Sequence, residues 1–278
     1  MNPAAVLTSD ATIAVVGAGR LGTVLARALR ATEFDVRGPS GRTDEIPQSD
    51  IALLCVPDAA IPEAAARTRP HVTLLGHVSG ATPLTDVDFS IHPLQTFTGT
   101  ESPEVFHGIG AAIDGRTPIA REAAEHLARA VGARPFPVDD AHRASYHAAA
   151  SFASNFVLTV LDAAEHLAES AGVSDARDLL APLVRQSVDN WRERGASEAL
   201  TGPIARGDIA TVERQREAAE REGLDVLFDA LANATGVVAR GERVSTRSLR
   251  SLAQRTEKGR SLAHGAENPA AGTSGGDA

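Results

Sequence analysis

The sequence predicts an α/β N-terminal domain followed by a mainly α-helical C-terminal domain. Short apolar runs alternate with helical segments as far as residue 138, which is typical of a mostly parallel sheet covered on both faces. Beyond residue 140 long alanine-rich helical stretches take over. The 278 residues suffice for two domains. We therefore expect domains at residues 1–139 and 140–262, and a disordered tail at 263–278.

Each expected strand is a short apolar run that ends at turn-forming residues. In chain order, the expected strands are 12–16, 34–37, 51–56, 72–75, 89–92, 109–113 and 134–138. Each expected helix has apolar residues at helical spacing. These helices are 20–31, 59–67, 118–131, 144–171, 175–194, 209–219 and 224–239.

Composition excludes several classes of protein. The net charge of −9 argues against a nucleic-acid partner, and no apolar run approaches the roughly 20 residues that span a membrane. Lys258 is the one lysine, so lysine-dependent catalysis elsewhere is excluded. Cys55, the one cysteine, excludes an internal disulfide or a cysteine zinc cluster and is expected to fill the core. No histidine spacing suggests a metal site, and we expect a cytoplasmic protein.

A glycine-rich turn links the first expected strand to the first expected helix. It reads Gly17, Ala18, Gly19, Arg20, Leu21 and Gly22, a G-x-G-x-x-G pattern. In this position the first glycine permits a tight turn, the second lets backbone approach a pyrophosphate, and the third lets helix and strand pack closely. The pattern and its context predict a Rossmann domain that binds a dinucleotide along these six residues.

The region after the second strand indicates which dinucleotide is bound. A strand-end acid that would hold the ribose of NAD is missing, whereas Arg37, Ser40 and Arg42 suit a 2′-phosphate. The sequence therefore favours NADP over NAD. Val56 and Pro57 end the next strand at the edge where such ligands lie, and Ser79 follows another strand. These residues are further cofactor-binding candidates, whereas Asp58 is expected to be a helix N-cap.

Several longer motifs carry a family resemblance. In order, they are the glycine turn, Val56-Pro57-Asp58, His77-Val78-Ser79-Gly80, His92-Pro93-Leu94-Gln95-Thr96-Phe97, Tyr146-His147-Ala148-Ala149-Ala150 and Gly202-Pro203-Ile204-Ala205-Arg206-Gly207-Asp208. Over residues 10–255 the chain resembles Rossmann-like proteins with a C-terminal domain of unknown function, DUF2520. These are similar in plan to ketopantoate reductase, pyrroline-5-carboxylate reductase and the 6-phosphogluconate dehydrogenase superfamily. The resemblance implies an NADP-dependent oxidoreductase and a homodimer formed through the helical domain.

The expected helix 144–171 contains candidates for catalysis. His147, Ser151 and Asn155 are spaced i, i+4, i+8, which would place them on one face. The resemblance to ketopantoate reductase places His147 where those enzymes keep a lysine. We expect His147 as a proton donor, with Asn155 and Ser151 fixing the substrate carbonyl or the nicotinamide amide. The alternative is a histidine hydrogen-bonded at the domain interface.

Three other positions supply rival or complementary candidates. His92 follows a strand and is a second candidate proton donor, with Gln95 close enough to bind the same substrate. Alternatively, His92 fixes its loop. Arg206 is expected to bind a substrate carboxylate. Asp208 either belongs to the same substrate site, where it could orient a histidine, or caps the following helix.

The expected activity is hydride transfer between NADP(H) and a small substrate. A 2-keto acid of the ketopantoate type is the first hypothesis, and a cyclic imine acid of the pyrroline-carboxylate type is the alternative. A protein of another class, a non-catalytic NADP-binding regulator or scaffold, would retain the same fold. Turnover with keto acids distinguishes these hypotheses.

Overall fold

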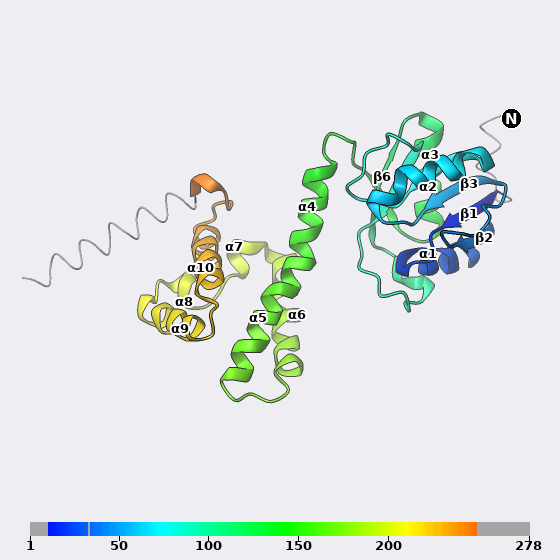
Figure 1. Cartoon of the computed structure of the whole chain (residues 1–278). Coiled ribbons are helices and arrows are strands. Elements are labelled where there is room, and N and C mark those ends of the chain that lie inside the picture. Colours follow the sequence, from blue (N-terminus) through cyan, green and yellow to red (C-terminus); the bar gives the residue numbers. More distant parts are fainter. Residues whose placement is uncertain (1–10, 33, 249–278) are drawn as a thin grey trace, which may run out of the picture. The chain divides into compact units, whose positions relative to one another are not determined.

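The computed structural model of the chain describes residues 11–32 and 34–248 (Figure 1). The chain divides into two compact units, Met1–Val157, here called the sheet unit, and Leu158–Ala278, here called the helical unit. The change from strands to helices comes near residue 138, as expected, but the sheet unit extends into the helices that follow. The expected tail at 263–278 and Lys258 lie outside the described residues.

A seven-stranded sheet with the order β2-β1-β3-β4-β5-β6-β7 forms the centre of the sheet unit. Its strands are β1 (Thr12–Val16), β2 (Asp35–Ser40), β3 (Ser49–Leu54), β4 (Val72–His77), β5 (Phe89–Pro93), β6 (Gly110–Gly115) and β7 (Arg134–Pro137). All neighbouring strands are parallel except β5 and β6, which are antiparallel. This arrangement confirms the predicted α/β class.

Alternating side chains of the strands form two apolar layers, one on each face of the sheet. Ile13 and Val15 of β1 pack in one layer, whereas Ala14 and Val16 pack in the other. The first layer includes apolar residues of α1 (Arg20–Arg30) and α3 (Pro118–Ala130), and the second includes residues of α2 (Ile61–Thr68). Both faces are therefore covered, which explains why the central strands read as nearly continuous apolar runs.

The single helix expected over 144–171 is two helices in the structure. Helix α4 (Arg143–Ala153) ends at Ser154, whose φ of −132° and ψ of −76° are not helical, and α5 (Asn155–Ser170) starts at the next residue. The apolar periodicity on both sides of Ser154 hid this break. The expected stripe of His147, Ser151 and Asn155 is therefore wrong, because Asn155 belongs to a different helix.

The helical unit continues with five more helices. They are α6 (Ala176–Arg194), α7 (Ala196–Ala199), α8 (Pro203–Arg206), α9 (Ile209–Arg221) and α10 (Asp225–Ala239), joined by short turns. Pro182 lies inside α6, and Arg216 of α9 donates hydrogen bonds to Asp229 of α10. The segment 202–208 contains the single-turn helix α8. In residues 11–32 and 34–248 no helix combines the length and apolarity needed to cross a membrane.

Short 3₁₀ helices complete the sheet unit. They are η2 (Asp58–Ala60), η3 (Arg69–His71) and η4 (Pro103–Phe106). Asp58 is the first residue of η2, whose N-cap is Pro57. The expectation that Asp58 is an N-cap is therefore wrong: Pro57 occupies that position, and η2 separates Asp58 from the start of α2.

Candidate functional site

The three glycines of the turn between β1 and α1 have different structural requirements. Gly17 has a φ of +118°, and a Cβ there would lie 2.2 Å from the Cys55 carbonyl oxygen. A Cβ on Gly22 would lie 1.9 Å from the Gly17 carbonyl oxygen, so the strand and helix can approach only around a glycine. Gly19 has open space within 4 Å of a Cβ position. The backbone at Gly19 is thus accessible to a ligand, as pyrophosphate binding requires.

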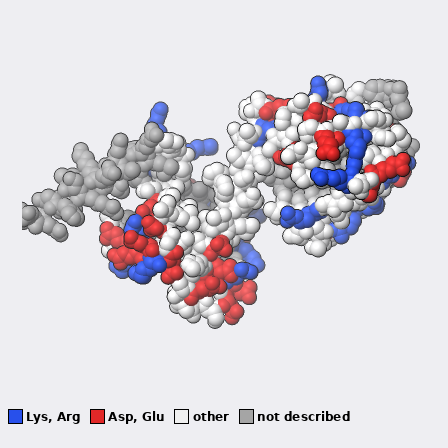
Figure 2. Space-filling view, in the orientation of Figure 1, with Lys and Arg blue, Asp and Glu red and all other residues white. Residues whose placement is uncertain are grey.

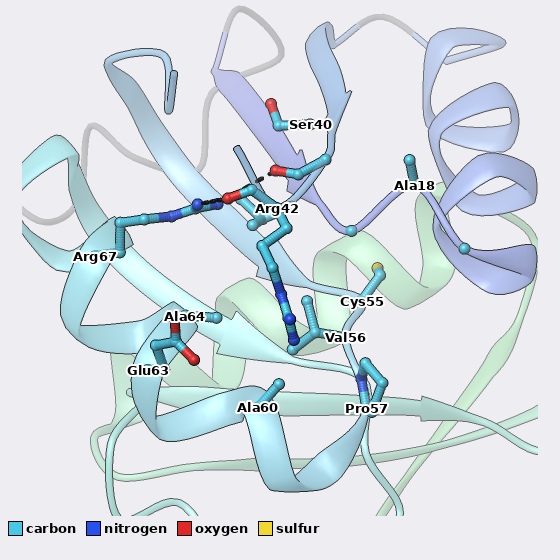
Figure 3. A pocket seen from close by; sticks show the side chains of 14 residues that line it. Ala18, Ser40, Arg42, Cys55, Val56, Pro57, Ala60, Glu63, Ala64 and Arg67 are labelled. Carbon is cyan, nitrogen blue, oxygen red and sulfur yellow. Dashed lines mark hydrogen bonds between the residues drawn. The ribbon is translucent and has the colours of Figure 1, made fainter. Parts of the chain in front are cut away.

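A pocket of about 220 Å³ lies beside this turn, at the carboxyl ends of β1, β2 and β3 (Figure 3). Its lining includes six residues expected to bind cofactor: Gly17, Ala18, Gly19, Ser40, Val56 and Pro57. Arg42 also lines it, and its side chain extends over the pocket toward Val56 and Ala60. Helix α2 adds Glu63 and Arg67. The turn, the strand ends and an arginine thus meet around one space that suits a nucleotide phosphate.

Two arginines bind the backbone near the end of β2, one within the strand and one just after it. Arg67 donates hydrogen bonds to the carbonyl oxygens of Arg42 and, at 3.3 Å, Gly41, and Figure 3 shows it reaching this segment from α2. Arg30 of α1 donates to the Gly38 carbonyl oxygen. Arg37 points elsewhere: it pairs with Asp35 at 3.2 Å and donates to the Gln48 carbonyl oxygen. The pair of arginines at the pocket is therefore Arg42 and Arg67 rather than Arg37 and Arg42.

Four expected cofactor residues do not line this pocket: Arg20, Leu21, Gly22 and Ser79. Arg20 is exposed beside Gly99, and Leu21 packs against the core. The Ser79 hydroxyl accepts hydrogen bonds from the amides of Ala81 and Thr82, at 3.1 and 2.9 Å, so it shapes a tight turn after β4. Cys55 lies below the turn, and burial raises the pKa of its thiol to about 12, which suits the expected core role.

Strand register places His92 at the same sheet edge as the glycine turn. Aligned residues run across the sheet from Val16 to Leu54, His77 and Ser90. His92 lies two residues beyond Ser90 along β5, past the ends of β3 and β4. In parallel α/β sheets ligands bind outside this carboxyl edge.

His92 is held between a glycine and the side chains of α4. Its Nδ1 lies 2.7 Å from the Tyr146 hydroxyl, and the two rings meet edge-on with centroids 5.5 Å apart. The His147 ring lies 6.0 Å from the His92 ring. A Cβ on Gly80 would lie 2.9 Å from the His92 ring, so only glycine fits beneath it. Both candidate histidines, His92 and His147, therefore lie close together, and Tyr146 of α4 contacts His92 of β5.

The surroundings of His92 and Tyr146 shift the pKa values of both side chains. Burial, and then the proximity of His147, lowers the pKa of His92 to about 4, although Asp58 opposes the shift. Burial raises the pKa of Tyr146 to about 12, although Arg143 opposes it. At neutral pH a neutral imidazole therefore faces a protonated phenol. Such a pair can deliver a proton and be recharged from water without a charged resting state.

The remaining candidates on α4, α5 and the β5 loop make local contacts. The Ser151 hydroxyl donates to the His147 carbonyl oxygen at 3.2 Å within α4. Asn155, at the start of α5, accepts a hydrogen bond from the Ser154 hydroxyl. Gln95 is exposed and accepts from the Thr96 amide at 2.9 Å. The substrate roles of these three residues stay predictions.

Arg206 and Asp208 lie in the helical unit. Arg206 is the exposed last residue of α8. The Asp208 carboxylate accepts a hydrogen bond from the Thr211 amide at 3.1 Å and caps α9, which was one of its two expected roles. Hydrogen bonding to Thr211 lowers the pKa of Asp208. Binding of a carboxylate by Arg206 stays a prediction.

Sequence reasoning did not assign Tyr146 or Arg67 to the site. Tyr146 directly precedes His147, but it lies outside the i, i+4, i+8 spacing of His147, Ser151 and Asn155 that indicated the other candidates. Arg67 is one of many arginines, and its place in α2 gives no signal of its proximity to the β2 loop. Among the described residues, no cluster of three metal-ligating side chains is present.

Comparisons with known proteins agree with this architecture. Residues 109–235 match the family described as Domain of unknown function (DUF2520), so the match starts at β6, ahead of the boundary expected at residue 140. No curated protein matches the chain. A candidate NADP oxidoreductase from Bacteroides fragilis superposes with a TM-score of 0.71 at 22% identity, over 82% of this chain and 98% of that one.

Two further structures show the same plan. Protein TM1727 from Thermotoga maritima has a TM-score of 0.68 at 22% identity, over 82% of this chain and 98% of its own. Plasmodium falciparum pyrroline carboxylate reductase with NADP bound has a TM-score of 0.54 at 11% identity, over 83% and 99%. Likeness at these identities shows the fold. The likeness thus shows a Rossmann-type fold followed by a helical region, and residues 109–235 match the DUF2520 family.

Proposed function

We propose that this chain is an NADP(H)-dependent oxidoreductase that transfers a hydride to or from a small 2-keto acid or its alcohol. The observation that carries the proposal is one sheet edge with two features: the glycine-turn pocket with Ser40 and Arg42, and the hydrogen-bonded pair His92 and Tyr146. The open space at Gly19 fits a pyrophosphate, because a Cβ would fill it. NADP-binding structures of the same fold support the choice of cofactor.

The pair His92 and Tyr146 performs the proton transfer of this reaction. When bound at the glycine turn, NADPH would supply the hydride that reduces the substrate carbonyl carbon. The Tyr146 hydroxyl gives its proton to the carbonyl oxygen, His92 Nδ1–H then reprotonates Tyr146, and His92 Nε2 takes a proton from water. This tautomer of His92 is our assignment. His147 lies beside this pair and adds polarity to the substrate space.

The presence of a built-in proton donor favours a substrate with a C=O group over one with a C=N group. Reduction of a ketone forms an alkoxide, which requires a proton at once. A cyclic imine is readily protonated in water before the hydride is transferred, so a built-in proton donor would increase the rate of its reduction less. The pyrroline carboxylate reductase of the same fold keeps the imine as the alternative substrate class.

The reaction is tested by following NADPH oxidation with a panel of 2-keto acids and cyclic imine acids. We expect turnover of a keto acid, and a loss of about 10²–10⁴-fold in kcat for His92→Ala and Tyr146→Phe with NADPH affinity retained. Tight NADPH binding without turnover of any substrate would support the non-catalytic alternative. Absence of thermal stabilisation by either NADPH or NADH would contradict both.

Preference for NADPH is tested at the β2 loop. Arg42→Ala is expected to weaken NADPH binding about tenfold or more and to leave NADH binding nearly unchanged, because a charge-assisted contact to the 2′-phosphate is lost. Arg37→Ala is the matched control, since Arg37 binds Asp35 and Gln48 instead. Equal losses for the two dinucleotides with Arg42→Ala would contradict a phosphate contact.

We also propose a homodimer formed through the helical unit. Large apolar side chains are exposed along α5 and α6, among them Leu158, Leu179, Leu183 and Trp191. Patches of this kind on a chain that folds alone are typical of an interface between subunits. Light scattering after size-exclusion chromatography tests the dimer.

A further inference from the structure

A buried arginine, Arg143, lies behind His92 and Tyr146. Arg143, in the first turn of α4, is 3% exposed. Its Nε donates to Asp140 Oδ1 at 2.6 Å, and its Nη2 donates to the hydroxyl of the fully buried Ser90 at 2.5 Å. Asp114 of β6 lies 3.8 Å away. A guanidinium is costly to bury, and here it is compensated by two carboxylates and a hydroxyl.

Arg143 and its partners Ser90 and Asp140 connect three segments that surround His92. Ser90 is on β5, two residues before His92. Asp140 accepts hydrogen bonds from the Leu84 amide at 3.1 and 3.2 Å, which fixes the end of the segment that holds Gly80 under the His92 ring. Arg143 itself is one helical turn before Tyr146, so it fixes the helix that carries the phenol.

We propose that Arg143 is a positioning residue that, with Asp140 and Ser90, holds the Tyr146 hydroxyl in hydrogen-bonding contact with His92. The stretch that follows it, 144–161, carries no Asp, Glu, Lys or Arg, and the visible face of α4 is largely uncharged in Figure 2. Charged contacts that fix this helix to the strand must therefore come from its start. The planar guanidinium can satisfy Asp140 and Ser90 together, which a lysine ammonium on a flexible chain cannot do in the same geometry.

The chain offers a site-specific probe, because Tyr146 is its one tyrosine. Labelling with ¹³Cζ-tyrosine gives one NMR signal whose position depends on the hydrogen bond of that hydroxyl. His92→Ala defines the signal of a Tyr146 that has lost its partner. We expect the signal of Arg143→Gln to move most of the way to that position, and the signals of Arg143→Lys and Ser90→Ala to move part of the way.

Arg121→Gln is the matched control. Arg121 pairs with the same Asp114, at 3.2 Å, but within the described part of the chain its side chain makes no hydrogen bond to α4, so its removal changes local charge without releasing the helix. The Tyr146 signal of Arg121→Gln is expected to stay at the wild-type position. If Arg143→Gln fails to fold, Ser90→Ala provides the test with the loss of a single hydroxyl. Wild-type signals in folded Arg143→Gln, or in Ser90→Ala when the former is unfolded, would overturn the proposal.

An activity measurement extends the test and rests on the proposed function. Arg143→Lys is expected to lower kcat about 10²-fold through displacement of the proton donor, while KM for NADPH stays unchanged. The NMR measurement needs neither cofactor nor substrate. An unchanged tyrosine signal therefore contradicts the positioning role alone, whereas a shifted signal without any turnover contradicts the proposed reaction alone.

Discussion

The two compact units bury their apolar residues to very different extents. The sheet unit has complete layers on both faces, with residues such as Ile13, Leu54 and Phe89 fully enclosed. In the described part of the helical unit, the buried apolar side chains are Ala176, Ala219 and Val237, while many larger ones are exposed. The sheet unit thus has a core of its own, whereas the helices have apolar surface that is stabilised only when another surface covers it.

The largest expected effect comes from charging the exposed stripe of α6. Leu179 and Leu183 are both 64% exposed and one helical turn apart. In a two-fold dimer each substitution acts twice, and burying one leucine contributes about 1.5–3 kcal/mol. Leu179→Asp with Leu183→Asp should therefore weaken dimerisation by more than about 10³-fold, as measured by analytical ultracentrifugation.

Leu94 provides the comparison for this experiment, because it is an exposed leucine of the sheet unit. Leu94→Asp should leave the dimer intact. Dissociation by Leu94→Asp, or a dimer that resists the double substitution in α6, would place the interface elsewhere than on α6.

In the sheet unit, adding a methyl group at two glycines of the β1–α1 turn should have different effects, one on stability and the other on cofactor binding. Gly22→Ala forces a Cβ against the Gly17 carbonyl oxygen and should cost about 3 kcal/mol of the free energy of unfolding. Gly19→Ala meets open space, so stability should change little while NADPH affinity falls at least tenfold. Thermal denaturation and fluorescence titration measure the two effects. Strong destabilisation by Gly19→Ala would contradict this division.

The same contrast between the two units explains which parts of the structure could be predicted from the sequence. Strands buried on both faces leave an unambiguous apolar pattern, so the sequence predicts seven strands and the glycine turn to within a few residues. The break at Ser154 leaves no signal, because alanine and phenylalanine continue the helical pattern on both sides. Polar contacts between distant segments are equally invisible to local patterns. His92 was predicted as a candidate, but its bond to Tyr146, 54 residues away, depends on the tertiary fold.

The buried imidazole should make the stability of the sheet unit depend on pH. The unfolded chain binds a proton on His92 near pH 6.5, whereas the folded chain binds it near pH 4. Folding stability is therefore fully present above pH 6.5 and falls as the pH drops toward 4. Allowing for partial exposure of the ring, the loss is about 2 kcal/mol.

Chemical denaturation at pH 7.5 and pH 5 measures the part of this loss that occurs above pH 5. Burial also lowers the pKa of His77, so His92→Asn should reduce the pH dependence without abolishing it. A wild-type stability that does not change between these two pH values would show that His92 is protonated normally in the folded protein.

The smallest expected effect concerns Asp208, the N-cap of α9 in the helical unit. Asp208→Ala removes the acceptor for the Thr211 amide and should lower the free energy of unfolding by about 1 kcal/mol, while Asp208→Asn retains a capping oxygen and most of the stability. Thr117→Ala makes the same change at the N-cap of α3, where the helix already packs against the core. Similar losses at both sites, with NADPH binding unchanged, would indicate that Asp208 acts as a cap. If Asp208→Asn is fully stable but impairs turnover of a keto acid, the carboxylate charge has the second role that the sequence left open, toward substrate or a histidine.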